Sequence, residues 1–86
     1  MSYQILYTHR AVRDIEKLSP AIKQRIGKSM LKLLENPFPH IRKLISSEIG
    51  TYRYRIGEYR VIIDIEGQEI VVLRVGHRRE IYRKVK

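Results

Sequence analysis

The spacing of hydrophobic residues changes once along the chain, from a helical period to a strand period. The short aromatic and β-branched run at residues 3–7 predicts a first strand. Apolar residues then recur at helical spacing over about ten residues after Thr8, and again from Pro20 until Asn36 precedes a proline. Thr8 and Ser19 are good N-caps, and proline is favoured at a first helical position. The first half therefore predicts a strand followed by an antiparallel pair of helices.

After His40, apolar and polar residues alternate with the period of a strand. This alternation predicts three strands, at about 51–56, 59–66 and 69–75. Gly57 and Gly67 each open a two-residue loop between strands, as in type II′ turns. Residues 43–45 are a candidate for a short edge strand. We therefore expect an α+β fold: an antiparallel sheet of about four strands with the N-terminal αα-hairpin packed on one face.

The length and composition fit one small domain spanning residues 1–86. A chain of 86 residues is too short for two hydrophobic cores. Its apolar runs have at most four residues, whereas a membrane span needs about 20. The absence of cysteine excludes disulfides, thiol catalysis and cysteine-zinc sites. We expect no signal peptide, no membrane association and a cytoplasmic location.

The charge balance favours an anionic partner. Eighteen Lys and Arg residues stand against nine Asp and Glu residues, giving a formal net charge of +9. Such a charge attracts nucleic acid or an acidic protein. The alternative is a basic surface with no ligand.

The register of the Gly57-Glu58 hairpin gathers three arginines. It places Arg55 opposite Arg60 and puts Arg53 on the same face, while the tyrosines point to the other face. Like charges facing each other weaken a sheet, and guanidinium groups on rigid strands form a cradle for phosphate. The alternative is a solvated face whose arginines pair with neighbouring carboxylates. We expect Arg60 to be accessible, so that Arg60→Ala leaves the fold almost unchanged.

The segment after the last strand adds further candidate chemistry. Gly76 lets the chain turn off the sheet, so that His77, Arg78 and Tyr82 could curl back toward the arginine face. Histidine exchanges protons near neutral pH, and tyrosine can stack on a base. The alternative is a basic tail in which Ile81 and Tyr82 pack on the sheet edge.

Three segments together resemble the RelE/ParE superfamily of bacterial and archaeal toxins, and most closely its RelE branch. They are Gly-Thr-Tyr-Arg-Tyr-Arg-Ile at 50–56, Tyr-Arg-Val at 59–61 and Val-Gly-His-Arg-Arg-Glu-Ile-Tyr at 75–82. The resemblance implies a type II toxin: a ribosome-dependent endoribonuclease that cleaves mRNA in the A site without metal or cofactor. It also implies a cognate acidic, RelB-like antitoxin, which binds a toxin that is monomeric alone.

The same resemblance implies a role for each candidate residue. Arg53 and Arg55 match basic residues that contact the base or neutralise the phosphate, and Arg60 matches an arginine that stabilises the transition state. Arg78 matches an arginine that protonates the leaving group or contacts the phosphate. Tyr82 matches a tyrosine that stacks on or orients the substrate. His77 stands where some relatives have lysine.

One departure from the family pattern concerns the general base. The RelE branch has lysines where this chain has Arg53 and Arg55, and arginine stays protonated. The proton of the attacking 2′-hydroxyl would then pass to His77, to Glu58, or to a group of the ribosome or the RNA.

Two other functions remain open at this point: a ParE-like toxin that inhibits DNA gyrase without catalysis, and a plain RNA-binding module. Metal catalysis is not expected, because His9, His40 and His77 lie on different predicted elements, the first two at the surface. We also expect an apolar strip on the arginine face, left open by the helices for the antitoxin. Its residues are Ile62, Val71, Leu73 and Val75.

Overall fold

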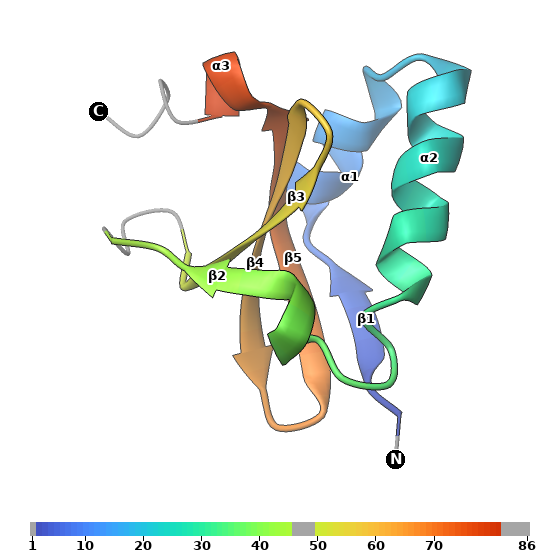
Figure 1. The fold of residues 1–86 in the computed structure, drawn as a ribbon. Coiled ribbons are helices and arrows are strands. Elements are labelled where there is room, and N and C mark those ends of the chain that lie inside the picture. The colour runs from blue at the N-terminus through green and yellow to red at the C-terminus, as the bar shows by residue number, and fades with distance from the viewer. Residues whose placement is uncertain (1, 46–49, 82–86) are drawn as a thin grey trace.

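The computed structural model describes residues 2–45 and 50–81, which form five strands, three α-helices and one 3-10 turn (Figure 1). In chain order these are β1 (Gln4–Tyr7), α1 (His9–Glu16), α2 (Pro20–Leu31), η1 (Phe38–His40), β2 (Ile41–Lys43), β3 (Tyr52–Ile56), β4 (Tyr59–Glu66), β5 (Glu69–His77) and α3 (Arg78–Ile81). No helix within these residues is long and apolar enough to cross a bilayer.

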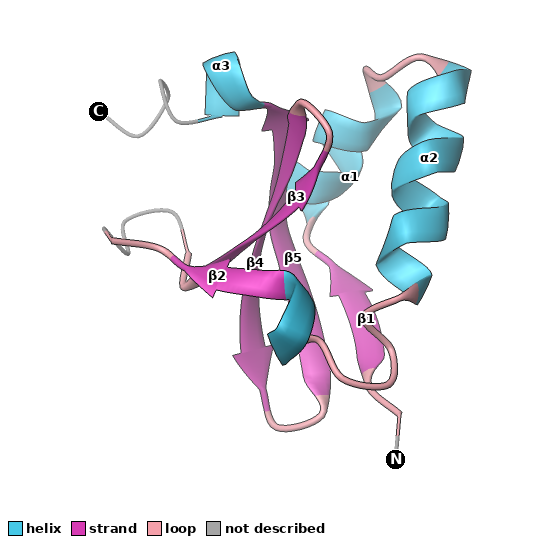
Figure 2. Cartoon of the chain, in the orientation of Figure 1, coloured by secondary structure: helices cyan, strands magenta, loops and turns pink. Residues whose placement is uncertain are grey.

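The strands form one sheet in the order β1-β5-β4-β3-β2, and α1 and α2 lie on the same side of it (Figure 2). The α+β class and the helix pair on one face are confirmed. The sheet has five strands rather than four, and β1 runs parallel to β5. The helix pair carries the chain from β1 to the far edge, where β2 begins an antiparallel meander. The meander returns across the sheet until its last strand lies beside β1.

Both predicted helix caps are formed. The Thr8 side-chain oxygen accepts a hydrogen bond from the Ala11 N–H at 3.1 Å, and Ser19 accepts one from the Ile22 N–H at 3.4 Å. Each bond satisfies a backbone donor that the first turn would otherwise leave free. The second helix ends at Leu31, earlier than expected, because the next residues tighten into turns with hydrogen bonds three residues apart.

The predicted hairpins are confirmed residue by residue. Gly57 and Gly67 have φ of +59° and +62°, and no other residue type among those described has positive φ. This combination fits type II′ turns, which need positive φ only at the first loop position. The two-residue loop fixes the pairing of β3 with β4, so that Arg55 faces Arg60 and Arg53 faces Ile62.

The expected apolar strip on the arginine face is wrong in part. A bulge shifts the register of β5, so that Ile62 faces Arg74 but Ile63 already faces Val72. The extra residue turns Val75 into the helix-covered core, where it is 3% exposed. Ile62 is also fully buried, because the backbone of Gly50 lies directly against it. Neither side chain is available to a partner.

Candidate functional site

A pocket of about 280 Å³ opens on the sheet face that α1 and α2 leave uncovered. It is lined by His40, Arg42, Arg53 and Arg55. The last two come from β3, where they alternate with the buried Tyr54, and Arg42 lies directly opposite Arg53 in β2. Alternation along paired strands therefore brings three guanidinium groups to one side of the sheet. We call this set of four residues the arginine pocket.

The charge of the arginine pocket is not compensated within the described part of the chain. No described carboxylate lies within ion-pair distance of Arg42, Arg53 or Arg55. Two neighbouring carboxylates are engaged elsewhere, since Asp64 accepts the Thr51 N–H at 2.8 Å and Glu58 pairs with Arg78. Facing cations cost stability, and an anionic ligand with several oxygens would offset that cost.

Arg60 is buried, contrary to expectation. It is 4% exposed, and its guanidinium donates hydrogen bonds to the carbonyl oxygens of Gly57 and Tyr59 at 2.9 and 3.0 Å. Its neighbour across the strand pair is Gly76, and Ile81 of α3 returns to pack against that glycine. The alternation of β4 predicts the face of Arg60 correctly but cannot show that α3 closes over this end of the sheet.

Arg78 lies at the same hairpin turn as the Arg60 guanidinium. Its Nε is 3.1 Å from Glu58 Oε1, and its N–H donates to the Glu58 carbonyl oxygen at 2.8 Å. Both arginines therefore contact the loop between β3 and β4. Arg78 is about half exposed, with a side-chain exposure of 48%, so it remains open to a ligand.

His77 does not turn back toward the arginine pocket. It pairs with Tyr59 on the helix side, where the two rings meet edge to face at 5.5 Å. Its Nδ1 accepts the Arg79 N–H at 3.1 Å. Tyr82 lies outside the described residues, and its proposed role stays a prediction.

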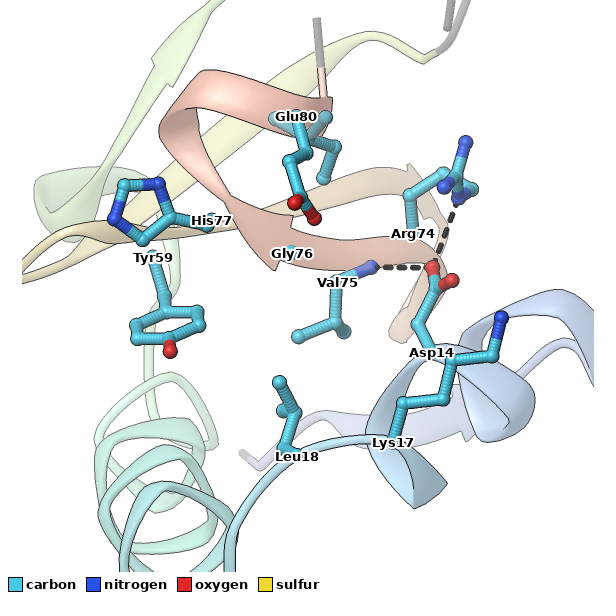
Figure 3. A pocket seen from close by; sticks show the side chains of 10 residues that line it. Asp14, Lys17, Leu18, Tyr59, Arg74, Val75, Gly76, His77 and Glu80 are labelled. Atoms are coloured by element: carbon cyan, nitrogen blue, oxygen red, sulfur yellow. Dashed lines mark hydrogen bonds and ion pairs between the residues drawn. The ribbon is translucent and has the colours of Figure 1, made fainter.

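A second pocket, of about 330 Å³, lies between α1, the end of β5 and α3 (Figure 3). In it, Asp14 Oδ2 accepts hydrogen bonds from Arg74 Nε at 2.8 Å and from the Val75 N–H at 3.0 Å. Burial alone would raise the pKa of Asp14. The bonds from Arg74 and Val75, with the charges of Arg74 and Arg10, outweigh burial and lower that pKa. In this pocket, unlike the arginine pocket, the guanidinium of Arg74 is therefore paired with the carboxylate of Asp14.

Sequence reasoning missed Arg42 and the position of His40 in the arginine pocket. The edge strand was expected at residues 43–45 but begins at Ile41. The available signal in the sequence was the alternation of polar and apolar residues in His40-Ile41-Arg42, and only Ile41 of these three is buried in the structure. Among the described residues, no group of three or more His, Cys, Asp or Glu side chains is placed to hold a metal ion.

Comparison with known proteins defines the class to which this fold belongs. A family model described as the ParE toxin of the type II toxin-antitoxin system matches residues 5–82. Toxin RelG from Mycobacterium tuberculosis is 36% identical over 98% of this chain and 100% of its own length. Toxin RelE3 from Methanocaldococcus jannaschii is 29% identical over 92% of this chain and 94% of its own length.

Solved structures agree with the sequence matches. The toxin-antitoxin complex RelBE2 from Mycobacterium tuberculosis has a chain with 31% identity and a TM-score of 0.82, over 91% of this chain and 100% of that one. A chain of the archaeal RelE-RelB complex from Pyrococcus horikoshii has 25% identity and a TM-score of 0.75, over 93% of this chain and 99% of that one. The chain belongs to the RelE/ParE superfamily of type II toxins and is a RelE-like member of it.

Proposed function

We propose that this toxin is a ribosome-dependent endoribonuclease that cleaves mRNA in the A site. The observation that carries the proposal is the arginine pocket, where three guanidinium groups meet on an open sheet face with no described carboxylate to neutralise them. The phosphodiester is an anion that such forks match through paired oxygen contacts.

In this mechanism the 2′-hydroxyl of one nucleotide attacks the adjacent phosphorus. A bond forms from the 2′-oxygen to phosphorus, the bond to the 5′-oxygen breaks, and the products carry a 2′,3′-cyclic phosphate and a 5′-hydroxyl. Negative charge grows on the phosphate oxygens as the transition state forms. We assign the stabilisation of that charge to Arg53 and Arg55, and their position in the lining of the pocket, on one strand, supports this role.

The arginines at the hairpin turn have different proposed roles. Arg78 is half exposed and can contact the phosphate or the leaving group. The burial of Arg60 and its bonds to Gly57 and Tyr59 favour a positioning role, in which it holds the turn that follows Arg55. We retain Tyr82 as the residue that stacks on the substrate.

The ribosome is the proposed source of substrate alignment. A cationic pocket that is open to solvent binds RNA but does not fix a 2′-hydroxyl in line with the leaving oxygen. Correct alignment can contribute several kcal/mol to a rate. Free RNA should therefore be a poor substrate.

An acidic RelB-like antitoxin is the proposed protein partner. Several of the solved neighbours are toxin-antitoxin complexes that contain RelB. The formal net charge of +9 on this chain favours an acidic partner of that kind.

The proposal is tested with purified toxin and an mRNA, either free or held on ribosomes with an empty A site. We expect new RNA ends within the A-site codon, a 2′,3′-cyclic phosphate on the upstream fragment, and much slower cleavage of free RNA. Equal cleavage of free and ribosome-bound mRNA would contradict ribosome dependence. Inhibition of gyrase supercoiling with no new RNA ends would replace the proposal with ParE-like inhibition.

A further inference from the structure

We propose that His40 is the general base of the arginine pocket, accepting the proton of the attacking 2′-hydroxyl. This inference rests on the proposed endoribonuclease function. It concerns the one step that the three arginines of the pocket cannot perform, because arginine stays protonated in proteins.

The chain holds His40 in place before β2 begins. His40 ends η1, and its N–H donates to the Pro37 carbonyl oxygen at 2.9 Å. Pro37 and Pro39 restrict the backbone of this turn, because proline fixes φ. The His40 ring lies edge to face with the Tyr54 ring, with centroids 6.3 Å apart and planes at 63°. The imidazole thus lies against a tyrosine that is itself held in the core.

The lining of the pocket combines arginines, which can bind an anion, with a histidine, which can exchange a proton. Arg42 comes from β2, which directly follows η1, and Arg53 and Arg55 come from β3. Within the described residues, the charged side chains that line the pocket with His40 are therefore all cations. Histidine is the side chain in this set that can take and release a proton near neutral pH. A phosphate held by the arginines would therefore lie beside a residue able to accept a proton from its neighbouring 2′-hydroxyl.

The other candidate bases of this chain are occupied or lie elsewhere. Nδ1 of His77 accepts the Arg79 N–H, and its ring lies against Tyr59 on the helix side. The carboxylate of Glu58 pairs with Arg78 at 3.1 Å. Neither of these two residues lines the arginine pocket. His40 therefore fits the missing role better than the bases expected from the sequence.

His40 takes up one proton and releases one proton in each turnover. The 2′-hydroxyl gives its proton to a ring nitrogen of His40, and the 2′-oxygen bonds to phosphorus. The 5′-oxygen leaves with the electron pair of its bond and takes a proton from water. The imidazolium then returns its proton to solvent, so that His40 is neutral for the next cycle.

The test compares His40→Gln with His9→Gln, which removes an exposed histidine at the start of α1. Single-turnover cleavage of ribosome-bound mRNA is measured between about pH 5 and pH 9, the range in which histidine titrates. We expect His40→Gln to slow cleavage by roughly 10²–10⁴-fold and to abolish the fall in rate at acid pH. His9→Gln should keep the rate and the pH profile of the wild type. Added imidazole should partly restore His40→Ala.

A binding measurement separates a base from a structural residue. An mRNA with a 2′-deoxy nucleotide at the cleavage position cannot react, and His40→Gln should bind it on ribosomes within about threefold of wild type. A much weaker complex, or no imidazole rescue, would overturn the assignment. So would a His40→Gln variant with the wild-type rate and pH profile. In each of these cases cleavage by wild type would leave the proposed function standing, whereas an inactive wild type would remove both.

Discussion

Two arginine sites at different places on the sheet show how the same side chain serves different ends. Beside α1, the Arg74 guanidinium lies 2.8 Å from Asp14, and the two side chains are only 15% and 10% exposed. In the arginine pocket, Arg53 and Arg55 have no described carboxylate within ion-pair distance. A paired and largely buried arginine stabilises the fold, whereas a cluster of unneutralised arginines is suited to an anionic ligand.

Asp14 also provides a hydrogen-bond acceptor to the part of β5 that β1 does not cover. Strand β1 covers β5 only as far as Tyr7 and Val72, and Thr8 then donates its hydroxyl to the Val72 carbonyl oxygen at 3.0 Å. Further along β5, Asp14 accepts the Val75 N–H at 3.0 Å. The carboxylate therefore satisfies a backbone donor of β5 beyond the point that β1 reaches. Activity and stability should accordingly respond to different arginine sites.

The largest effect is expected at Arg55. Arg55→Ala removes a guanidinium from the arginine pocket and should slow cleavage of ribosome-bound mRNA by roughly 10²–10³-fold. The melting temperature should hardly change, because Arg55 is exposed and has no described ion pair. Arg55→Lys should restore only part of the rate, because an ammonium lacks the planar fork. A wild-type rate in Arg55→Ala would show that the pocket does not bind the reacting phosphate.

The second effect concerns stability. Asp14→Ala leaves Arg74 largely buried without its carboxylate and leaves the Val75 N–H unpaired. We expect the free energy of unfolding to fall by about 2–4 kcal/mol, measured by urea denaturation. Glu16→Ala, on the same helix but exposed, is the matched control and should change it by less than about 0.5 kcal/mol. Equal losses in both variants would contradict the structural role of Asp14.

Substitution of Arg60 tests whether one arginine can both stabilise the fold and contribute to cleavage. Because it is buried and bonded to two carbonyl oxygens, Arg60→Ala should lower the free energy of unfolding by about 1–3 kcal/mol. This replaces the expectation from the sequence that the substitution spares the fold. A positioning role predicts slower cleavage even at temperatures where the variant is fully folded. A folded Arg60→Ala with the wild-type cleavage rate would remove Arg60 from the proposed mechanism.

The smallest effect is the acid dependence of stability that Asp14 causes. Its pKa is lower in the folded protein than in the unfolded chain, so the unfolded chain binds a proton more readily. The stabilisation is therefore complete above about pH 4 and is lost as the pH falls through the lower, folded value. The difference in unfolding free energy between wild type and Asp14→Asn should shrink as the pH falls from about 6 to about 2. A difference that stays constant would contradict this assignment.

The sequence predicts those features that local chemistry fixes. A glycine at the first position of a two-residue loop determines the register of β3 and β4, and this register places Arg53 and Arg55 on one face. The N-caps at Thr8 and Ser19 follow equally from local hydrogen bonding. Two of the four pocket residues, Arg53 and Arg55, could therefore be predicted from the sequence alone.

The remaining features depend on contacts between distant segments. The bulge that turns Val75 inward changes the face of a residue without altering the alternation pattern around it. The burial of Arg60 depends on α3 and Ile81, which pack against Gly76 from the far end of the chain. Arg42 enters the pocket only through the pairing of a three-residue edge strand. Such a strand is too short to give a clear periodic signal.

The central claim is that the arginine pocket, and not the overall charge of the protein, carries the activity. The most direct test compares two double variants that lose the same charge, Arg53→Ala/Arg55→Ala in the pocket and Arg13→Ala/Lys28→Ala at exposed positions of α1 and α2. The measurement is the single-turnover rate at which ribosome-bound mRNA acquires a 2′,3′-cyclic phosphate end. We predict at least a roughly 10³-fold loss for the pocket variant and a rate within about threefold of wild type for the control. Equal losses in the two folded variants, or no loss in the pocket variant, would contradict the claim.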